Sequence, residues 1–118
     1  MSDPLVEVRD LEIRLGAGPP VLAVPALDVR RGETLAVLGP NGAGKSTLFA
    51  ALACLRRWSA GTLRFDGRPV ERPGPAALAY RRQLAVVMQD PLLLDATALD
   101  NAAQGLRYRG VGRREARR

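Results

Sequence analysis

The chain has 118 residues, of which 47% are hydrophobic, and this length suits one domain rather than two. It contains one cysteine and no histidine, which excludes a disulfide framework, His-ligated zinc and Ser-His-Asp catalysis. The sequence has no apolar stretch of about eighteen residues and no basic leader before an apolar run. We therefore expect neither a membrane span nor a secretory signal.

The positive charge gathers near the end of the sequence. The net charge is +6, and residues 106–118 hold six arginines and one acid, whereas the preceding residues are close to neutral. Aromatic residues make up 4% of the chain, which leaves few rings to stack on bases. We interpret the basic end as a solvated helix and do not expect nucleic acid as a partner.

The first half of the chain predicts strands followed by a helix. Alternating apolar and charged residues at 5–15 predict a half-buried antiparallel strand, and 21–29 continues as an extended stretch in which Pro25 marks either a sheet edge or an irregularity. The short apolar run 34–38 predicts a strand buried on both faces of a parallel sheet. A helix is expected over 44–57, with one apolar face and arginines in its last turn.

The middle of the chain predicts a hairpin, a short helix and another strand. A strand at 62–65 leads into an Asp-Gly pair that is typical of a tight hairpin turn. The pattern then predicts a short helix over 76–82 and a second buried strand over 84–88.

The last third of the chain predicts helices. Thr97, followed by Asp100 three residues later, resembles a capping box, so a helix is expected from about Thr97 to Tyr108. Glycines end this helix, and 113–118 begin another.

Residues 39–47 read Gly-Pro-Asn-Gly-Ala-Gly-Lys-Ser-Thr and fit the pattern G-x-x-x-x-G-K-[ST]. Glycines between a strand and a helix allow positive φ angles, so that successive N–H groups point into one concavity at the positive end of the helix. Lys45, the one lysine of the chain, can contact β- and γ-phosphates, and the Ser46 hydroxyl can bind Mg²⁺. A glycine-rich turn that binds nothing is the alternative; the predicted strand and helix on either side favour a phosphate site.

These motifs together resemble the ATP-binding cassette (ABC) transporter ATPases. Residues 31–48 resemble the phosphate-loop region of that family, 59–67 its S-x-G-x-[IL]-x-[FL]-x-G turn, and 84–91 its Q-loop. Asp100 and Asn101, with the Gly-Leu-Arg that follows, resemble the segment that opens the helical subdomain. The resemblance implies an α/β fold of the P-loop NTPase class: an incomplete ABC-type ATPase core with an N-terminal antiparallel β-subdomain. Residues 1–118 would be the N-terminal portion of one ATP-binding domain.

The resemblance also implies the cofactors ATP and Mg²⁺ and a set of site residues. Backbone amides of 41–45 and the side chain of Thr47 would surround the phosphates, while Ser46 and Gln89 would hold Mg²⁺. From its position alone, Gln89 fits an ordinary polar residue at the end of a strand equally well. The implied nucleotide-binding residues are Gly39, Pro40, Asn41, Gly42, Ala43, Gly44, Lys45, Ser46, Thr47 and Gln89.

Two features depart from the family pattern. The stretch 13–16 carries no aromatic residue to stack on adenine, and Leu15 offers only an apolar surface. The family's signature motif, catalytic glutamate, D-loop and switch histidine are not found in the sequence and would follow residue 118. No catalytic set is therefore complete, and we expect nucleotide binding without hydrolysis by these residues alone. The run 34–38 would also lack its neighbouring strands, which implies a bare apolar face and marginal stability.

The resemblance implies an ATP-binding subunit of an ABC transporter, which couples ATP binding and hydrolysis to solute transport. Its partners would be a transmembrane permease subunit, whose coupling helix meets the loop 89–96, and a second cassette. It would lie in the cytoplasm, on the inner face of the cell membrane. The sequence looks most like importer cassettes for small oxyanions. The alternatives are a non-transport ABC-type ATPase that acts on nucleic acid or ribosomes, and a non-catalytic nucleotide-binding module.

Overall fold

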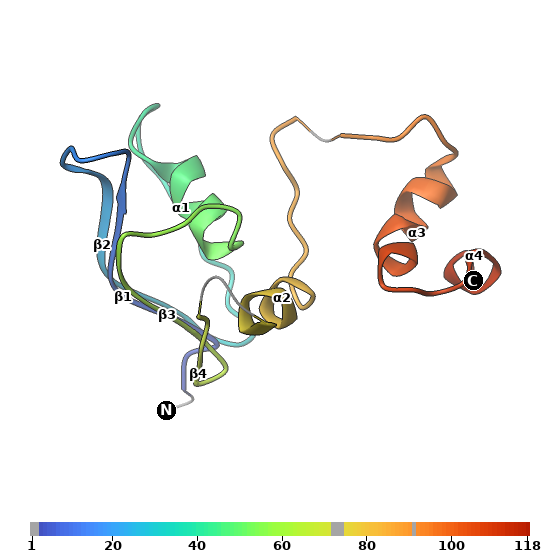
Figure 1. The fold of residues 1–118 in the computed structure, drawn as a ribbon, viewed down its shortest axis with the longest axis horizontal. Helices are drawn as coiled ribbons and strands as arrows, with labels where there is room; N and C mark the ends of the chain where they lie inside the picture. Colours follow the sequence, from blue (N-terminus) through green and yellow to red (C-terminus); the bar gives the residue numbers. More distant parts are fainter. Residues whose placement is uncertain (1–2, 72–74, 91) are drawn as a thin grey trace. The chain divides into compact units, whose positions relative to one another are not determined.

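The computed structural model describes residues 3–71, 75–90 and 92–118. The chain divides into two compact units, residues 1–86 and 87–118. The first unit contains the sheet and helices α1 and α2, and the second contains α3 and α4 (Figure 1). Within the described ranges, no helix combines the length and the apolar character that a bilayer span requires.

A four-stranded antiparallel sheet forms the base of the first unit, in the order β2-β1-β3-β4 (Figure 1). Of the two alternatives that Pro25 marks, the sheet edge is confirmed, because β2 is outermost in this order. A proline cannot donate a ladder hydrogen bond, and an edge strand tolerates it because one side of that strand has no partner to receive such a bond. The strands are β1 (Val6–Arg14), β2 (Pro20–Val29), β3 (Ala60–Phe65) and β4 (Arg68–Pro69).

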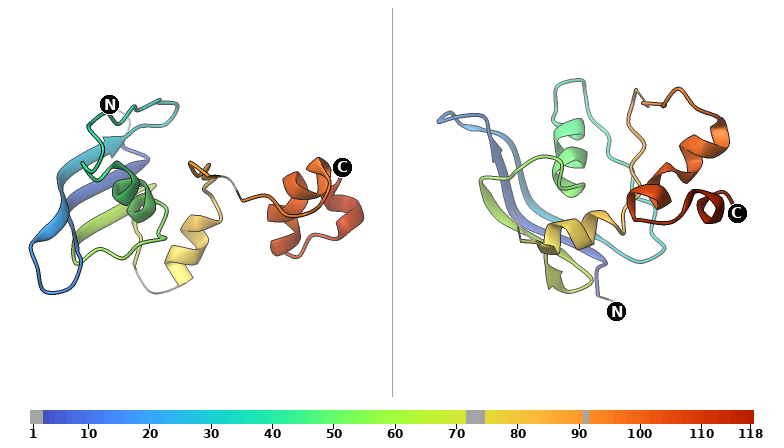
Figure 2. Two further views of the ribbon diagram at one scale, coloured as in Figure 1. Left: turned by 90° about the horizontal axis from the view of Figure 1, so that it is seen from above. Right: turned by 45° about the vertical axis from the view of Figure 1, so that its right-hand side comes forward.

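Helices α1 and α2 lie on one side of the sheet (Figure 2), and the core of the first unit is formed by side chains of the sheet and these helices. Helix α1 spans Lys45–Leu52 and α2 spans Pro75–Arg81, close to the prediction for the latter. The rings of Phe65 and Tyr80 join β3 to α2 in an edge-to-face pair with centroids 5.0 Å apart. The other main core side chains are Val8, Leu11, Ile13, Ala51, Cys54, Leu63, Val70 and Ala77.

Strand β1 contains a bulge at Asp10, whose φ is +47°. The pairing of β1 with β3 changes register between Arg9 and Glu12. The extra residue shifts the side-chain alternation by one, so that Val8 and Leu11 both face the core. Gly61 of β3 passes close to this bulge: a Cβ added there would lie 2.2 Å from the Asp10 carbonyl oxygen.

The predicted Asp-Gly hairpin turn is confirmed. Phe65 pairs with Arg68, and the two residues between them, Asp66 and Gly67, have φ angles of +51° and +72°. Positive φ at both central positions is the type I′ arrangement, whose twist matches that of the flanking strands.

The two buried strands predicted at 34–38 and 84–88 are not formed, and this corrects the sequence analysis. Leu38 is 90% exposed and Val87 is 92% exposed. A buried parallel strand needs hydrogen-bonded neighbours, whereas the sheet of the described residues is antiparallel and includes neither segment. The predicted bare apolar face at 34–38 is confirmed.

Helix α1 ends at Leu52, earlier than the predicted residue 57. The backbone turns at Cys54, where φ is +54°, and the amides of Leu55 and Arg56 both donate to the carbonyl oxygen of Ala50. This turn places the Cys54 side chain in the core instead of extending the helix. The predicted apolar helix face is consequently incomplete, because Phe49 stays 53% exposed.

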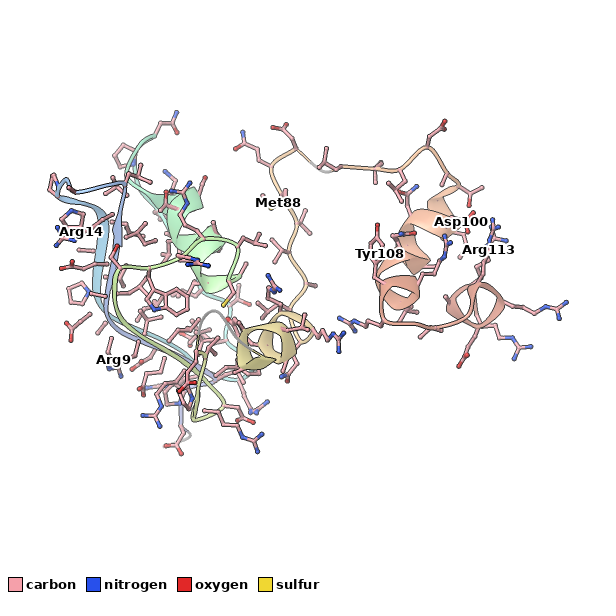
Figure 3. The ribbon with its side chains drawn as sticks, in the orientation of Figure 1. Arg9, Arg14, Met88, Asp100, Tyr108 and Arg113 are labelled. Atoms are coloured by element: carbon pink, nitrogen blue, oxygen red, sulfur yellow. The ribbon has the colours of Figure 1, made fainter. Side chains whose placement is uncertain are left out.

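The second unit contains α3 (Ala98–Tyr108) and α4 (Arg113–Ala116), near the predicted ranges. The predicted cap is confirmed: the Thr97 hydroxyl accepts a hydrogen bond of 3.1 Å from the Asp100 amide. The Asp100 carboxylate in turn accepts two bonds from the Arg117 guanidinium, at 2.6 and 2.8 Å, and Arg113 lies 3.5 Å away (Figure 3). The basic end is therefore not wholly solvated, since part of it ties α4 to α3.

We predict that Gly61→Ala destabilises the first unit far more than Gly67→Ala. Both glycines have positive φ, which costs an alanine about 1–2 kcal/mol. A Cβ at Gly67 meets open space, whereas at Gly61 it meets the backbone of Asp10. We expect a loss of at least about 3 kcal/mol at Gly61, measured by urea unfolding. Equal losses in the two variants would contradict the close approach at the bulge.

We predict that acid loosens the link between α3 and α4. Hydrogen bonds from Arg117 and Thr97 lower the pKa of Asp100 to about 2. A lowered carboxyl pKa stabilises the fold above the unfolded value of about 3.9, and this contribution is lost as pH falls towards 2. The protection factors of the α4 amides, which correct for the intrinsic pH dependence of exchange, should fall over that range.

Asp100→Asn should remove most of this pH dependence, and Asp95→Asn, at an exposed position in the same unit, should retain it. Identical acid profiles for the native chain and Asp100→Asn would contradict the assignment.

Candidate functional site

The loop before α1 brings the phosphate-loop residues together at the N-terminus of that helix. Gly42 and Gly44 have φ angles of +84° and +99°, as the motif requires. Gly44 is the N-cap of α1, and its carbonyl oxygen accepts the first helical bond from Leu48 at 2.8 Å. No side chain caps this end of the helix, so amides of its first turn remain available to an anion.

The Lys45 ammonium contacts the same loop. Its Nζ donates to the carbonyl oxygens of Gly39 and Pro40, the latter at 2.7 Å. The loop is also closed by a 3.2 Å bond from the Ala43 amide to the Pro40 carbonyl. A bound phosphate would replace carbonyl oxygens with charged oxygens around the ammonium group, which strengthens its hydrogen bonds.

Leu22 of β2 packs against the loop at Gly44. A Cβ added to Gly44 would lie 3.1 Å from the Leu22 Cδ1 atom. Leu22 pairs with Ile13 of β1, so this contact joins the sheet to the start of α1. Sequence reasoning missed this role, because Leu22 reads as one apolar residue among several in a strand. Only the fold brings it to the loop.

The remaining predicted residues fall in both units. Ser46 and Thr47 lie in the first turn of α1, directly after the loop, and Ser46 is exposed. A hydroxyl oxygen in that position suits Mg²⁺, which favours oxygen ligands. Gln89 is exposed and belongs to the second unit. Its joint role with Ser46 at a metal ion stays a prediction.

Asn101 organises the segment that precedes α3 in the second unit. Its side-chain oxygen accepts from the Leu94 amide at 2.8 Å, and its amide nitrogen donates to the carbonyls of Leu94, Ala96 and Thr97. These bonds fix the backbone of residues 94–97, whereas the side chains of Leu92, Leu93 and Leu94 are exposed to solvent. A groove of about 780 Å³ lies beside it, lined by Leu92, Leu93, Leu94, Ala96, Ala98, Asn101, Ala102, Gln104 and Tyr108.

Comparison with known proteins gives a consistent result. Residues 22–117 match the sequence model of the ABC transporter family. The chain is 44% identical over 91 residues to the taurine import ATP-binding protein TauB of Pseudomonas aeruginosa, and 39% identical over 117 residues to the macrolide export ATP-binding/permease protein MacB of Bordetella avium. Among solved structures, cbiO1 of Clostridium perfringens, described as part of the ABC transporter complex cbiONQ, superposes with a TM-score of 0.83 at 29% identity.

The alignments cover most of this chain but less than half of each relative. The alignments cover 76% of the chain for TauB, 94% for MacB and 98% for cbiO1. The chain spans 32% of the length of TauB, 18% of MacB and 47% of the cbiO1 chain.

We predict that Leu22→Ala weakens anion binding at the loop. The expected loss of affinity is larger than the lower stability of the folded variant can explain. The matched control is Leu27→Ala, which removes the same atoms from β2, where Leu27 pairs with Val8. Because both side chains are half-buried, each variant should lose about 1–3 kcal/mol of stability. Only Leu22→Ala should raise the Kd for magnesium–ATP, measured by titration at a temperature where both variants are folded. Matching Kd values in the two variants would contradict a positioning role for Leu22.

Proposed function

Because the chain belongs to the ABC transporter family, we propose that it provides the nucleotide-binding part of an ATP-binding subunit that drives solute transport. The observation that carries this proposal is the loop at 39–47. There, two positive-φ glycines, an uncapped helix N-terminus and Lys45 meet at one place. This combination suits a polyphosphate, since it offers several amide donors and a cationic side chain together.

Each group of the loop has a distinct part in the proposal. Amides of 41–45 hold the phosphate chain, and Lys45 leaves the carbonyls of Gly39 and Pro40 to contact the terminal phosphates. The hydroxyl of Ser46 would hold Mg²⁺, and Gln89 is the second residue proposed as a ligand. The ion would supply positive charge that neutralises the phosphates. Without a complete catalytic set, the 118 residues bind the nucleotide and do not sustain hydrolysis.

We propose a permease subunit as the membrane partner and a second cassette as the partner across the nucleotide. The apolar groove beside the segment held by Asn101 supports the first, because it presents exposed leucines on a fixed backbone. With such a partner, the proposed location of the protein is the cytoplasmic side of a membrane. The name of the taurine import relative favours a small oxyanion as the solute.

We predict that Lys45→Ala lowers the affinity for magnesium–ATP at least about tenfold, because a charge-assisted hydrogen bond contributes about 1.5–3 kcal/mol. The control is Arg68→Ala, which removes one positive charge from an exposed site on β4. Calorimetric titration of the native chain and both variants measures the Kd, and a phosphate-release assay on the same samples should show no sustained turnover.

Unchanged binding in Lys45→Ala would contradict the phosphate site. Turnover by the native chain that disappears in Lys45→Ala would contradict the expected lack of hydrolysis.

A further inference from the structure

The short helix α4 and the residues that follow it carry a cluster of arginines that the proposed function does not use. Arg113, Arg114, Arg117 and Arg118 are close together in the sequence, and all four are exposed. Glu115 is the one acidic residue between 106 and 118. Positive charge is therefore concentrated at α4, and the arrangement of the arginines decides what this charge can bind.

These four arginines share one face of α4. Arg117 continues the helical turn in the αR conformation, and the Arg118 amide donates to the Glu115 carbonyl at 3.1 Å. At about 3.6 residues per turn, the four arginines fall within an arc of about 140°, and Glu115 lies outside that arc. Ala116, on another side of the helix, is buried. The four arginines therefore form a single exposed surface, the α4 basic face.

Asp100 fixes one edge of the α4 basic face. Its carboxylate accepts bonds of 2.8 and 2.6 Å from Arg117, and Arg113 lies 3.5 Å from it (Figure 3). At the other edge, the side chains of Arg114 and Arg118 have no hydrogen bond or ion pair with any residue that the structure describes. Their guanidinium groups can therefore bind an external anion, while Asp100 holds the helix that presents them.

The chemistry of the α4 basic face suits a surface of phosphate groups. Guanidinium groups form paired, charge-assisted hydrogen bonds with phosphate oxygens. Recognition of nucleic acid bases is less well served, because residues 109–118 contain no aromatic residue to stack on an exposed base. Helix α4 also spans four residues, or about 6 Å, which is too short to place several side chains on base edges in a major groove.

We propose that the α4 basic face binds the anionic phospholipids of a membrane surface. An anionic leaflet attracts clusters of arginine by charge, and this attraction needs no recognition of sequence. The choice of a membrane over a nucleic acid rests in part on the proposed function, which puts the chain beside a membrane subunit. The contact itself needs no nucleotide, since Arg114 and Arg118 lie outside the phosphate loop.

Co-sedimentation of the native chain with lipid vesicles tests the proposal. One set of vesicles contains phosphatidylcholine alone, and in the other set phosphatidylglycerol replaces one third of it. The chain should sediment with the anionic vesicles and not with the neutral ones. Raising the salt concentration from about 50 to 500 mM should release it, because salt screens exposed charges. Equal binding to both sets would assign the attachment to exposed apolar side chains and overturn the proposal, as would binding to neither.

A matched pair of double variants tests the position of the contact. Arg114→Gln with Arg118→Gln removes two charges from the α4 basic face and leaves the bonds of Asp100 in place. Because one arginine near an anionic surface changes binding about fivefold, this variant should bind at least about tenfold more weakly. Arg68→Gln with Arg81→Gln removes the same charge from exposed positions on β4 and α2, and should weaken binding less than about threefold. Equal losses in the two variants would overturn the proposal.

Two further measurements separate the proposal from its alternatives. Tighter binding to duplex DNA than to anionic vesicles, compared per phosphate at about 0.15 M salt, would assign the α4 basic face to nucleic acid and overturn the proposal. Titration of the Arg114→Gln, Arg118→Gln variant with magnesium–ATP should give the Kd of the native chain. ATP binding by the native chain without vesicle binding would overturn this proposal alone, whereas vesicle binding without ATP binding would overturn the proposed function alone.

Discussion

The site depends on the way the chain enters α1. An N-terminal helix turn leaves amides that must bond to a side chain, to water or to a ligand. Here the N-cap is Gly44, which supplies no capping side chain and adopts a left-handed φ of +99°. A Cβ at this position would lie 3.1 Å from the Leu22 Cδ1 atom, a tighter contact than is usual. The packing of Leu22 against Gly44 therefore helps to set how α1 begins, and this start leaves the amides of the first turn without a side-chain cap.

Elements that are determined by neighbours in the sequence could be predicted. The Asp66-Gly67 turn needs only two residues that accept positive φ, and the start of α3 needs only Thr97 and the amide three residues later. The phosphate loop belongs to this class too, because its glycines, lysine and serine are contiguous. Such signals require no knowledge of distant parts of the chain. The resemblance to a known family then suggested the function of the loop.

Features that depend on distant partners could not be predicted. The apolar runs 34–38 and 84–88 have strand composition, but a strand exists only when another strand pairs with it. The bulge at Asp10 follows from the close passage of Gly61, about fifty positions later in the sequence. The contact of Leu22 with Gly44 and the turn that buries Cys54 are likewise set by packing. None of these carries a local pattern, so a reading of the sequence misses them.

The second unit shows a different way of fixing a short segment. A buried carboxylate lies between its helices: Asp100 is 7% exposed and receives hydrogen bonds from Thr97 and Arg117. Asn101, the next residue, holds the preceding backbone through four bonds. Because these polar bonds do the fixing, Leu92 and Leu93 are not needed for a core and can remain exposed. Adjacent polar residues at the start of α3 thus order this unit while leaving its apolar side chains available for contact with a partner.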